Sequence, residues 1–189
     1  MTIGTARGWI SLSILVAAST LAACSASRNS SVAVVPGKLV PPSSKVYLTA
    51  VADGQERREG VAAGSGFAVA VGLRDALLKE GFPPLLSDSS DLAAGLAEAS
   101  RLGYTYLVRG AITEWEDNAT PVSTRPDRAA LSVELYDVAK HELIATSTHQ
   151  VEGAHGDYTS RTPDRFIPEL ADTCLAALFG WKPTIVTRR

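Results

Sequence analysis

The sequence predicts a single α/β domain in which helices pack on a mixed sheet of about five strands. Strand and helix patterns follow one another in the order β-α-β-α-β-β-β-α over residues 45–181. Two successive β-α-β units imply parallel strands, and two late strands joined by a short turn imply antiparallel strands at one edge. The 46% of hydrophobic and 20% of charged residues are typical of a folded domain rather than a disordered chain.

The first 23 residues have the layout of a secretion signal. Arg7 precedes an apolar run from Trp9 to Ala18, and a Leu-Ala-Ala-Cys sequence ends at Cys24. The apolar run of about a dozen residues is shorter than the roughly 20 that a membrane-spanning helix requires. We therefore expect residues 1–23 to be removed when the protein is exported.

The Leu-Ala-Ala-Cys sequence resembles the lipobox of bacterial lipoproteins. The resemblance implies that Cys24 becomes the first residue of the mature protein and is the lipid attachment site, carrying diacylglycerol and a further acyl chain such as palmitate. Each buried methylene contributes about 0.8 kcal/mol of membrane affinity, so several chains anchor the protein firmly. Ser25 implies, by resemblance to Gram-negative lipoproteins, the outer membrane, where the domain is expected on the periplasmic face.

The segment after the cysteine is rich in serine and contains Pro36, Pro41 and Pro42. It shows no periodic apolar pattern, so residues 24–44 are expected to form a flexible tether.

The first half of the domain is expected to contain two strands and two helices. Residues 45–51 are rich in β-formers and predict the first strand, which is followed by a turn and by a charged loop at 56–59. A helix is predicted over 65–80, with Gly81 ending it. The side chains expected on its inward face are Phe67, Ala70, Val71, Leu77 and Leu78. A short strand at 84–87 and a helix that starts after an N-cap at 88–91 and ends at Gly103 complete this half.

The second half is expected to contain three strands and one helix. Residues 104–115 are enriched in aromatic and β-branched side chains, which predicts a central strand. Alternating patterns at 130–138 and 143–151 predict an antiparallel hairpin. A helix is predicted from the Thr-Pro-Asp cap that begins at Thr162 to Phe179, and residues 182–189 form a tail.

Several motifs of site chemistry are incomplete in this sequence. Gly64-Ser65-Gly66 lacks the third glycine and the lysine of a nucleotide loop, so it is interpreted as a backbone-driven helix start. The three histidines, His141, His149 and His155, have spacings of eight and six that suit no metal site, and the last two are expected at the surface. Cys174 is expected to be a small buried hydrophobe. We therefore expect no metal and no cofactor.

Three segments resemble a family of uncharacterised Gram-negative lipoproteins that is defined by a domain of unknown function. They are residues 112–120, residues 125–128 and residues 133–138. Gly64-Ser65-Gly66 and Tyr106-Leu107-Val108 fit the same pattern, and the resemblance covers about residues 45–179. The order of elements is also similar to that of the TolB amino-terminal domain and of the lipoprotein LpoB, a likeness of fold alone.

The sequence favours a non-enzymatic, membrane-anchored binding or scaffolding module of the envelope. Trp115 is a large amphipathic aromatic of the kind that anchors interfaces, so an interaction surface for an envelope protein is expected. Its residues are Trp115, Glu116, Asp117, Arg125 and Asp127. Two alternatives are a glycan hydrolase that uses Glu114 or Glu116, and a small-ligand carrier. The net charge of −2 is not that of a nucleic-acid-binding protein, and the oligomeric state is left open.

Overall fold

The computed structural model describes residues 27–34, 40, 44–56, 60–118, 125–154 and 162–184. The strands in this part of the chain are β1 (Ser27–Val34), β2 (Val46–Leu48), β3 (Gly54–Glu56), β4 (Gly60–Ala62), β5 (Leu85–Leu86), β6 (Tyr106–Glu116), β7 (Arg128–Asp137) and β8 (Glu142–Glu152). The helices are α1 (Ser65–Lys79), α2 (Leu92–Arg101) and α3 (Ile167–Phe179), and a 3₁₀ turn, η1 (Pro163–Phe166), leads into α3.

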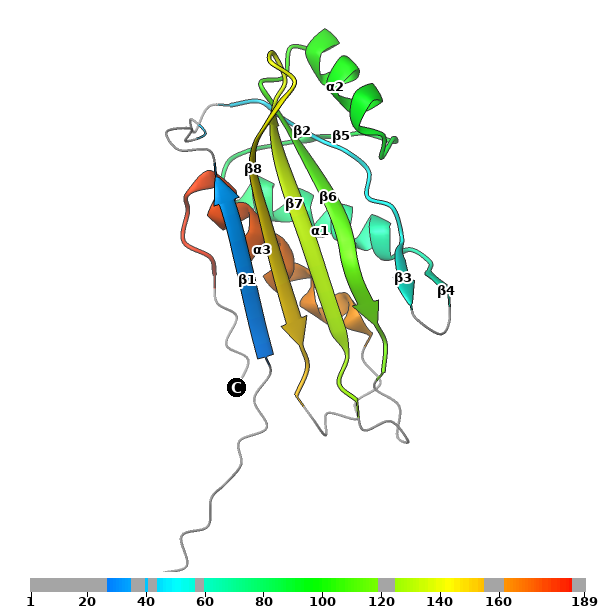
Figure 1. The fold of residues 1–189 in the computed structure, drawn as a ribbon. Coiled ribbons are helices and arrows are strands. Elements are labelled where there is room, and N and C mark those ends of the chain that lie inside the picture. Colours follow the sequence, from blue (N-terminus) through cyan, green and yellow to red (C-terminus); the bar gives the residue numbers. More distant parts are fainter. Residues whose placement is uncertain are drawn as a thin grey trace, which may run out of the picture.

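The main sheet has six strands in the order β1-β8-β7-β6-β2-β5 (Figure 1). β2 pairs in parallel with β5 and β6, whereas β6, β7, β8 and β1 are antiparallel neighbours. The predicted α/β class, mixed sheet and hairpin are therefore confirmed, with one strand more than the five expected.

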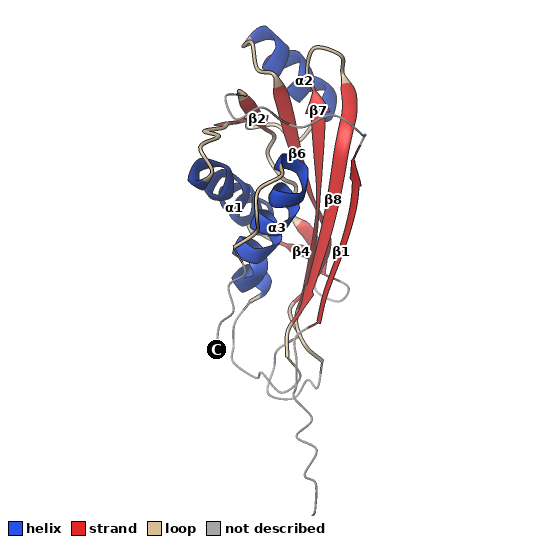
Figure 2. Ribbon diagram, turned by 90° about the vertical axis from the view of Figure 1, so that its left-hand side faces the viewer, coloured by secondary structure: helices blue, strands red, loops and turns tan. Residues whose placement is uncertain are grey.

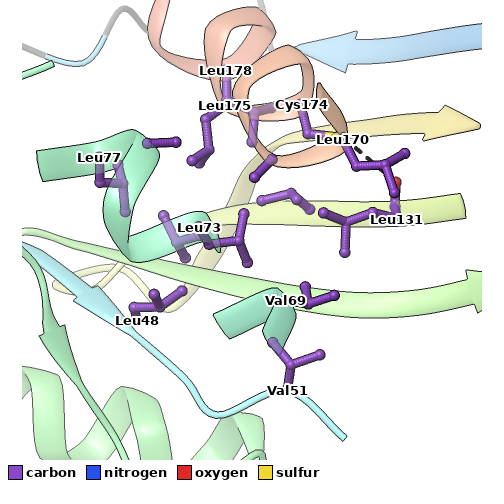
Figure 3. Packing of buried hydrophobic residues seen from close by; sticks show 14 of the residues in the cluster. Leu48, Val51, Val69, Leu73, Leu77, Leu131, Leu170, Cys174, Leu175 and Leu178 are labelled. Atoms are coloured by element: carbon purple, nitrogen blue, oxygen red, sulfur yellow. Dashed lines mark hydrogen bonds between the residues drawn. The ribbon is translucent and has the colours of Figure 1, made fainter. Parts of the chain in front are cut away.

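Helices cover both faces of this sheet. α1 and α3 lie together on one face (Figure 2), and their apolar side chains enclose the larger core with β2, β6, β7 and β8 (Figure 3). α2 covers part of the opposite face: Tyr47 and Leu107 pack with it, while their neighbours Leu48 and Val108 belong to the larger core. Successive residues of a strand point to opposite faces, so β2 and β6 each supply side chains to both cores.

Helix α1 begins at the predicted residue and ends one residue before the predicted end, but its inward face differs from the prediction. Its buried stripe is Val69, Ala70, Leu73, Ala76 and Leu77, which follows the 3.6-residue period. Phe67 and Leu78 were predicted to face inward, but they are 72% and 48% exposed. The prediction was wrong because it chose the largest side chains rather than the stripe with the correct period.

Signals at the helix ends are confirmed. The carboxylate of Asp91 accepts a hydrogen bond from the Ala94 amide at 2.7 Å and caps α2. Pro163 opens the η1 turn ahead of α3, and Gly180 ends α3 with a left-handed φ of 84°.

The expectation of a flexible tether over 24–44 is wrong for residues 27–34, which form β1. All eight residues pair with β8, from Ser27 opposite Glu152 to Val34 opposite Ala145. β1 lies at the edge of the sheet, and its sequence has few apolar side chains. An edge strand can be held by backbone pairing without a buried apolar face, so the alternation on which strand prediction depends is missing.

The expected charged loop at 56–59 starts at the end of β3 and precedes β4, and these two strands pair as a small antiparallel hairpin that was not predicted; residues 57–59 are outside the described part. None of the helices that the structure describes is long and apolar enough to cross a bilayer.

Candidate functional site

Trp115 belongs to the interior of the protein. Its side chain is 4% exposed and is part of the larger core. β3 packs closely on it, since a Cβ atom at Gly54 would lie 3.1 Å from the Trp115 Cβ. Trp115 therefore holds β3 against β6, and its predicted role as an exposed contact residue is wrong.

Asp127 lies in a buried polar cluster at the end of the sheet where β6 stops and β7 starts. Its carboxylate is fully buried, accepts a hydrogen bond from the Asn118 amide at 2.8 Å and pairs with the Arg165 guanidinium at 2.5 Å. The Arg165 guanidinium also lies 4.5 Å above the Phe166 ring, and the Asp127 carbonyl accepts from the Gly153 amide. The cluster ties the β6–β7 connection to η1, so the prediction of a surface role for Asp127 is also wrong.

The other three residues of the predicted surface are accessible. Asp117 and Arg125 are exposed, and Glu116 is half-buried with its carboxylate accepting from the Asn118 side-chain amide at 3.1 Å. The structure thus divides the predicted surface into an exposed part and a buried structural part.

A groove of about 390 Å³ lies beside Trp115. Its lining is Gln55, Thr113, Glu114, Trp115, Glu116, Ala130, Thr148 and Gln150. The Glu114 carboxylate accepts a hydrogen bond from the Gln150 side-chain amide at 2.8 Å. The two carboxylates named in the hydrolase hypothesis therefore line one groove, and each is bonded to a neighbouring amide.

The Gly64-Ser65-Gly66 motif starts α1, as predicted. The Asp53 carboxylate accepts from the amides of Gly64 and Gly66 at 3.1 and 2.8 Å, and the Ser65 hydroxyl accepts from the Gly54 amide. A Cβ atom at Gly66 would lie 2.2 Å from the Val51 carbonyl oxygen, so the motif is needed for close packing. A side chain of the protein already occupies the amides that would bind a phosphate in a nucleotide loop.

Val61 and Phe67 are a feature that the sequence patterns did not reveal. They lie on either side of the turn before α1 and are 60% and 72% exposed. Patches of exposed apolar side chains are typical of contact surfaces, and these two lie near one another along the chain on either side of one turn. The helical period would have revealed Phe67, because it lies off the stripe defined by Val69 and Leu73.

His149 lies on β8 as predicted, but it is buried rather than at the surface. Its side chain points to the face of α3, where Nδ1 is 2.6 Å from the Ser30 hydroxyl and Nε2 is 3.6 Å from the Glu169 carboxylate. Glu169 also accepts two hydrogen bonds from the Arg28 guanidinium. These four residues form a cluster, here called the β1 latch, that joins β1 to β8 and α3.

Cys174 is buried on α3, as predicted, and burial raises the pKa of its thiol to about 12. Within the described ranges, no group of three or more His, Cys, Asp and Glu residues could hold a metal ion. His141 is exposed in the β7–β8 turn with a positive φ of 56°. The signal, Cys24 and His155 lie outside the described residues.

The fold is similar to that of solved structures. PelC from Paraburkholderia phytofirmans, solved as a dodecamer, matches with a TM-score of 0.60 and 19% identity over 80% of this chain and 97% of its own. The lipoprotein GNA1162 from Neisseria meningitidis matches with a TM-score of 0.50 and 7% identity over 69% of this chain and 94% of its own. At these identities the likeness is one of fold.

A DUF330 protein from Xanthomonas campestris also matches, with a TM-score of 0.48 and 9% identity over 72% of this chain and 85% of its own. The sequence itself matches no known family model and no curated protein. The resemblance to the TolB domain and LpoB stays a prediction.

Proposed function

We propose that this chain is a lipoprotein anchored at the periplasmic face of the outer membrane, where it acts as a non-enzymatic binding module of the envelope. The observation that carries the proposal is Cys24, which closes the Leu-Ala-Ala-Cys sequence three residues before the first strand of the folded domain. Export and acylation act on this segment of sequence. The shared fold of the lipoprotein GNA1162 agrees with the proposal.

The anchor is tested with the two cysteines of the chain. In a Gram-negative host, the wild-type protein is expected to lose residues 1–23, gain the mass of its lipids and fractionate with the outer membrane. Cys24→Ser abolishes the acylation, while Cys174→Ser, the matched control, keeps both the lipid mass and the location. Unprocessed and unacylated wild-type protein in the cytosol would overturn the proposal.

The proposed partner is a protein, and further copies of this chain are the first candidate. PelC, whose fold is similar, forms a dodecamer, and Val61 and Phe67 provide exposed apolar contacts beside α1. Aromatic residues that fill a pocket at an interface contribute about 2 kcal/mol or more. We therefore expect Phe67→Ser to weaken self-association at least tenfold, a factor of ten being about 1.4 kcal/mol.

The measurement is mass photometry of the unlipidated domain over a concentration series. Leu78→Ser is the control, because Leu78 is an exposed apolar residue at the other end of the same helix. Two results would contradict the proposed contact role of Val61 and Phe67. One is a wild-type protein that is monomeric and captures no envelope protein, and the other is a Phe67→Ser variant that associates as strongly as the wild type.

A second candidate function is glycan hydrolysis, favoured by the groove that contains Glu114 and Glu116. The bonds from Gln150 and Asn118 to these carboxylates support a structural role for them instead. Purified protein is expected to release no fragments from muropeptides. If the wild type releases fragments and either Glu114→Gln or Glu116→Gln abolishes the release, the protein is a hydrolase and the proposal of a non-enzymatic binding module is wrong.

A further inference from the structure

The lipid-bearing cysteine is separated from the first strand by a very short stretch of chain. Cys24 is three residues before Ser27, where β1 begins. A chain spans at most about 3.6 Å per residue, so the two Cα atoms lie within about 11 Å in any conformation. The domain therefore has little freedom to move away from its anchor, provided that β1 stays paired.

The pairing of β1 determines which end of the domain is next to the anchor. Ser27 lies opposite Glu152 at the end of β8, and Glu152 lies opposite Arg128 at the start of β7. Arg128 in turn pairs with Glu116 at the end of β6. These four residues mark one end of the sheet, here called the anchor end, where the chain enters β1 in Figure 1.

β1 is attached to the domain by side chains as well as by its backbone. In the β1 latch, Arg28 pairs with Glu169 on α3, and Ser30 bonds to His149 on β8. Both contacts occur in the first four residues of the strand. The part of β1 nearest to the lipid is therefore the part that is fixed to α3.

We propose that the anchor end of the sheet faces the bilayer and that the domain stands on the lipid surface in one orientation. The proposal rests on the lipid anchor at Cys24. A flexible tether of about 20 residues would reach about 70 Å and allow every orientation of the domain. Three residues ahead of a paired strand reach only about 11 Å and restrict the orientation. The occupant of this surface is the headgroup layer of the membrane that holds the acyl chains.

The opposite end of the sheet then points into the periplasm. β8 has eleven residues, so the β7–β8 turn around Ala139 lies about 35 Å from the anchor end at 3.4 Å per residue. α2 lies at the same far end (Figure 1). Partners that approach from the periplasm meet this end first.

The orientation is tested on the mature, lipidated protein in liposomes that contain a headgroup-attached quencher. A fluorophore is placed at one of two exposed positions in a Cys174→Ser background, by Asp117→Cys near the anchor end or by Ala139→Cys at the far end. Quenching is expected to be severalfold stronger at position 117 than at 139.

Latch variants separate the two parts of the proposal. Arg28→Ala with Ser30→Ala is expected to reduce the difference between the two labels, whereas Arg101→Ala, which removes an exposed ion pair with Glu98 on α2, leaves it unchanged. Protein that floats with the liposomes but is quenched equally at both positions overturns the orientation alone. Processed protein that carries no lipid and does not float overturns the anchor, and the orientation with it.

Discussion

Two polar clusters attach strands of the sheet to the α3 region, and they differ in burial. The Asp127–Arg165 pair joins the β6–β7 connection to η1, with side-chain exposures of 0% and 16%. The Arg28–Glu169 pair of the β1 latch joins β1 to α3, with exposures of 47% and 21%. The first pair lies inside the domain, whereas the second lies at its edge in contact with water.

This difference implies two different tasks. Separating a largely buried ion pair leaves a charge without its counter-charge in a poorly solvated site, so the Asp127 cluster is expected to be essential for the fold. An exposed pair is screened by solvent and contributes little to global stability, so the latch is expected to control only the attachment of β1. The domain thus combines a fixed body with an edge strand whose attachment is weaker.

The largest effect is expected from Asp127→Ala. The change leaves the Arg165 guanidinium without its buried partner and the Asn118 amide without its acceptor, and should lower the free energy of unfolding by about 3–5 kcal/mol. Urea unfolding of the unlipidated domain measures it. Asp164→Ala, at an exposed neighbouring carboxylate that accepts a hydrogen bond from the Thr162 hydroxyl, should cost about 1 kcal/mol or less.

The double variant Asp127→Ala with Arg165→Met completes this comparison. Removing both charges should restore part of the lost stability, since an apolar replacement of a buried pair is often close to neutral. A single Asp127→Ala variant as stable as the wild type would show that the cluster is not essential for the fold.

The parts of the fold predicted from sequence are those determined by local signals. α1 and α2 were placed by the Gly64 and Asp91 starts, and β6 to β8 by their apolar and β-branched patterns. β1 was missed because its partner, β8, follows more than a hundred residues later and no local apolar alternation marks it. Long-range backbone pairing of a polar edge strand leaves no pattern in the strand itself.

The candidate site was predicted less well, for a related reason. A tryptophan and an aspartate at a strand end occur both in interfaces and in buried structural clusters. Residues distant in the sequence decide which of the two they form. Gly54 allows β3 to cover Trp115, and Arg165, 38 residues further along, pairs with Asp127. Cys174 was predicted correctly because the apolar helix around it suffices to indicate burial.

An intermediate effect on the pH dependence of stability is expected from Cys174. It tests whether water reaches the interior beneath α3. Burial raises its pKa from 9.0 to about 12, so the folded state binds a proton that the unfolded state releases above pH 9. This contribution is complete below pH 9 and is lost as the pH rises towards 12, by about 1.4 kcal/mol at pH 10. The free energy of unfolding is measured at pH 7.5 and at pH 10 for the wild type and for Cys174→Ala. Its decrease between the two pH values should be about 1.4 kcal/mol smaller for the variant than for the wild type. Equal losses in the two proteins would mean that water reaches the thiol.

The smallest effect on global stability is expected from Arg28→Ala. The Arg28–Glu169 pair is partly exposed, so its loss should cost about 1 kcal/mol or less, and the difference should shrink at high salt because ions screen the pair. Arg101→Ala provides the matched surface control.

Hydrogen exchange distinguishes a latch from an ordinary surface ion pair. Arg28→Ala should accelerate exchange of the β1 amides and of the β8 amides that pair with them, while amides of β6 and β7 keep their protection. Faster exchange confined to these amides would show that the Arg28–Glu169 pair contributes to holding β1 on β8 and α3. Uniform acceleration across the sheet would instead mean that β1 unfolds only together with the domain, and the contrast between the two clusters would disappear.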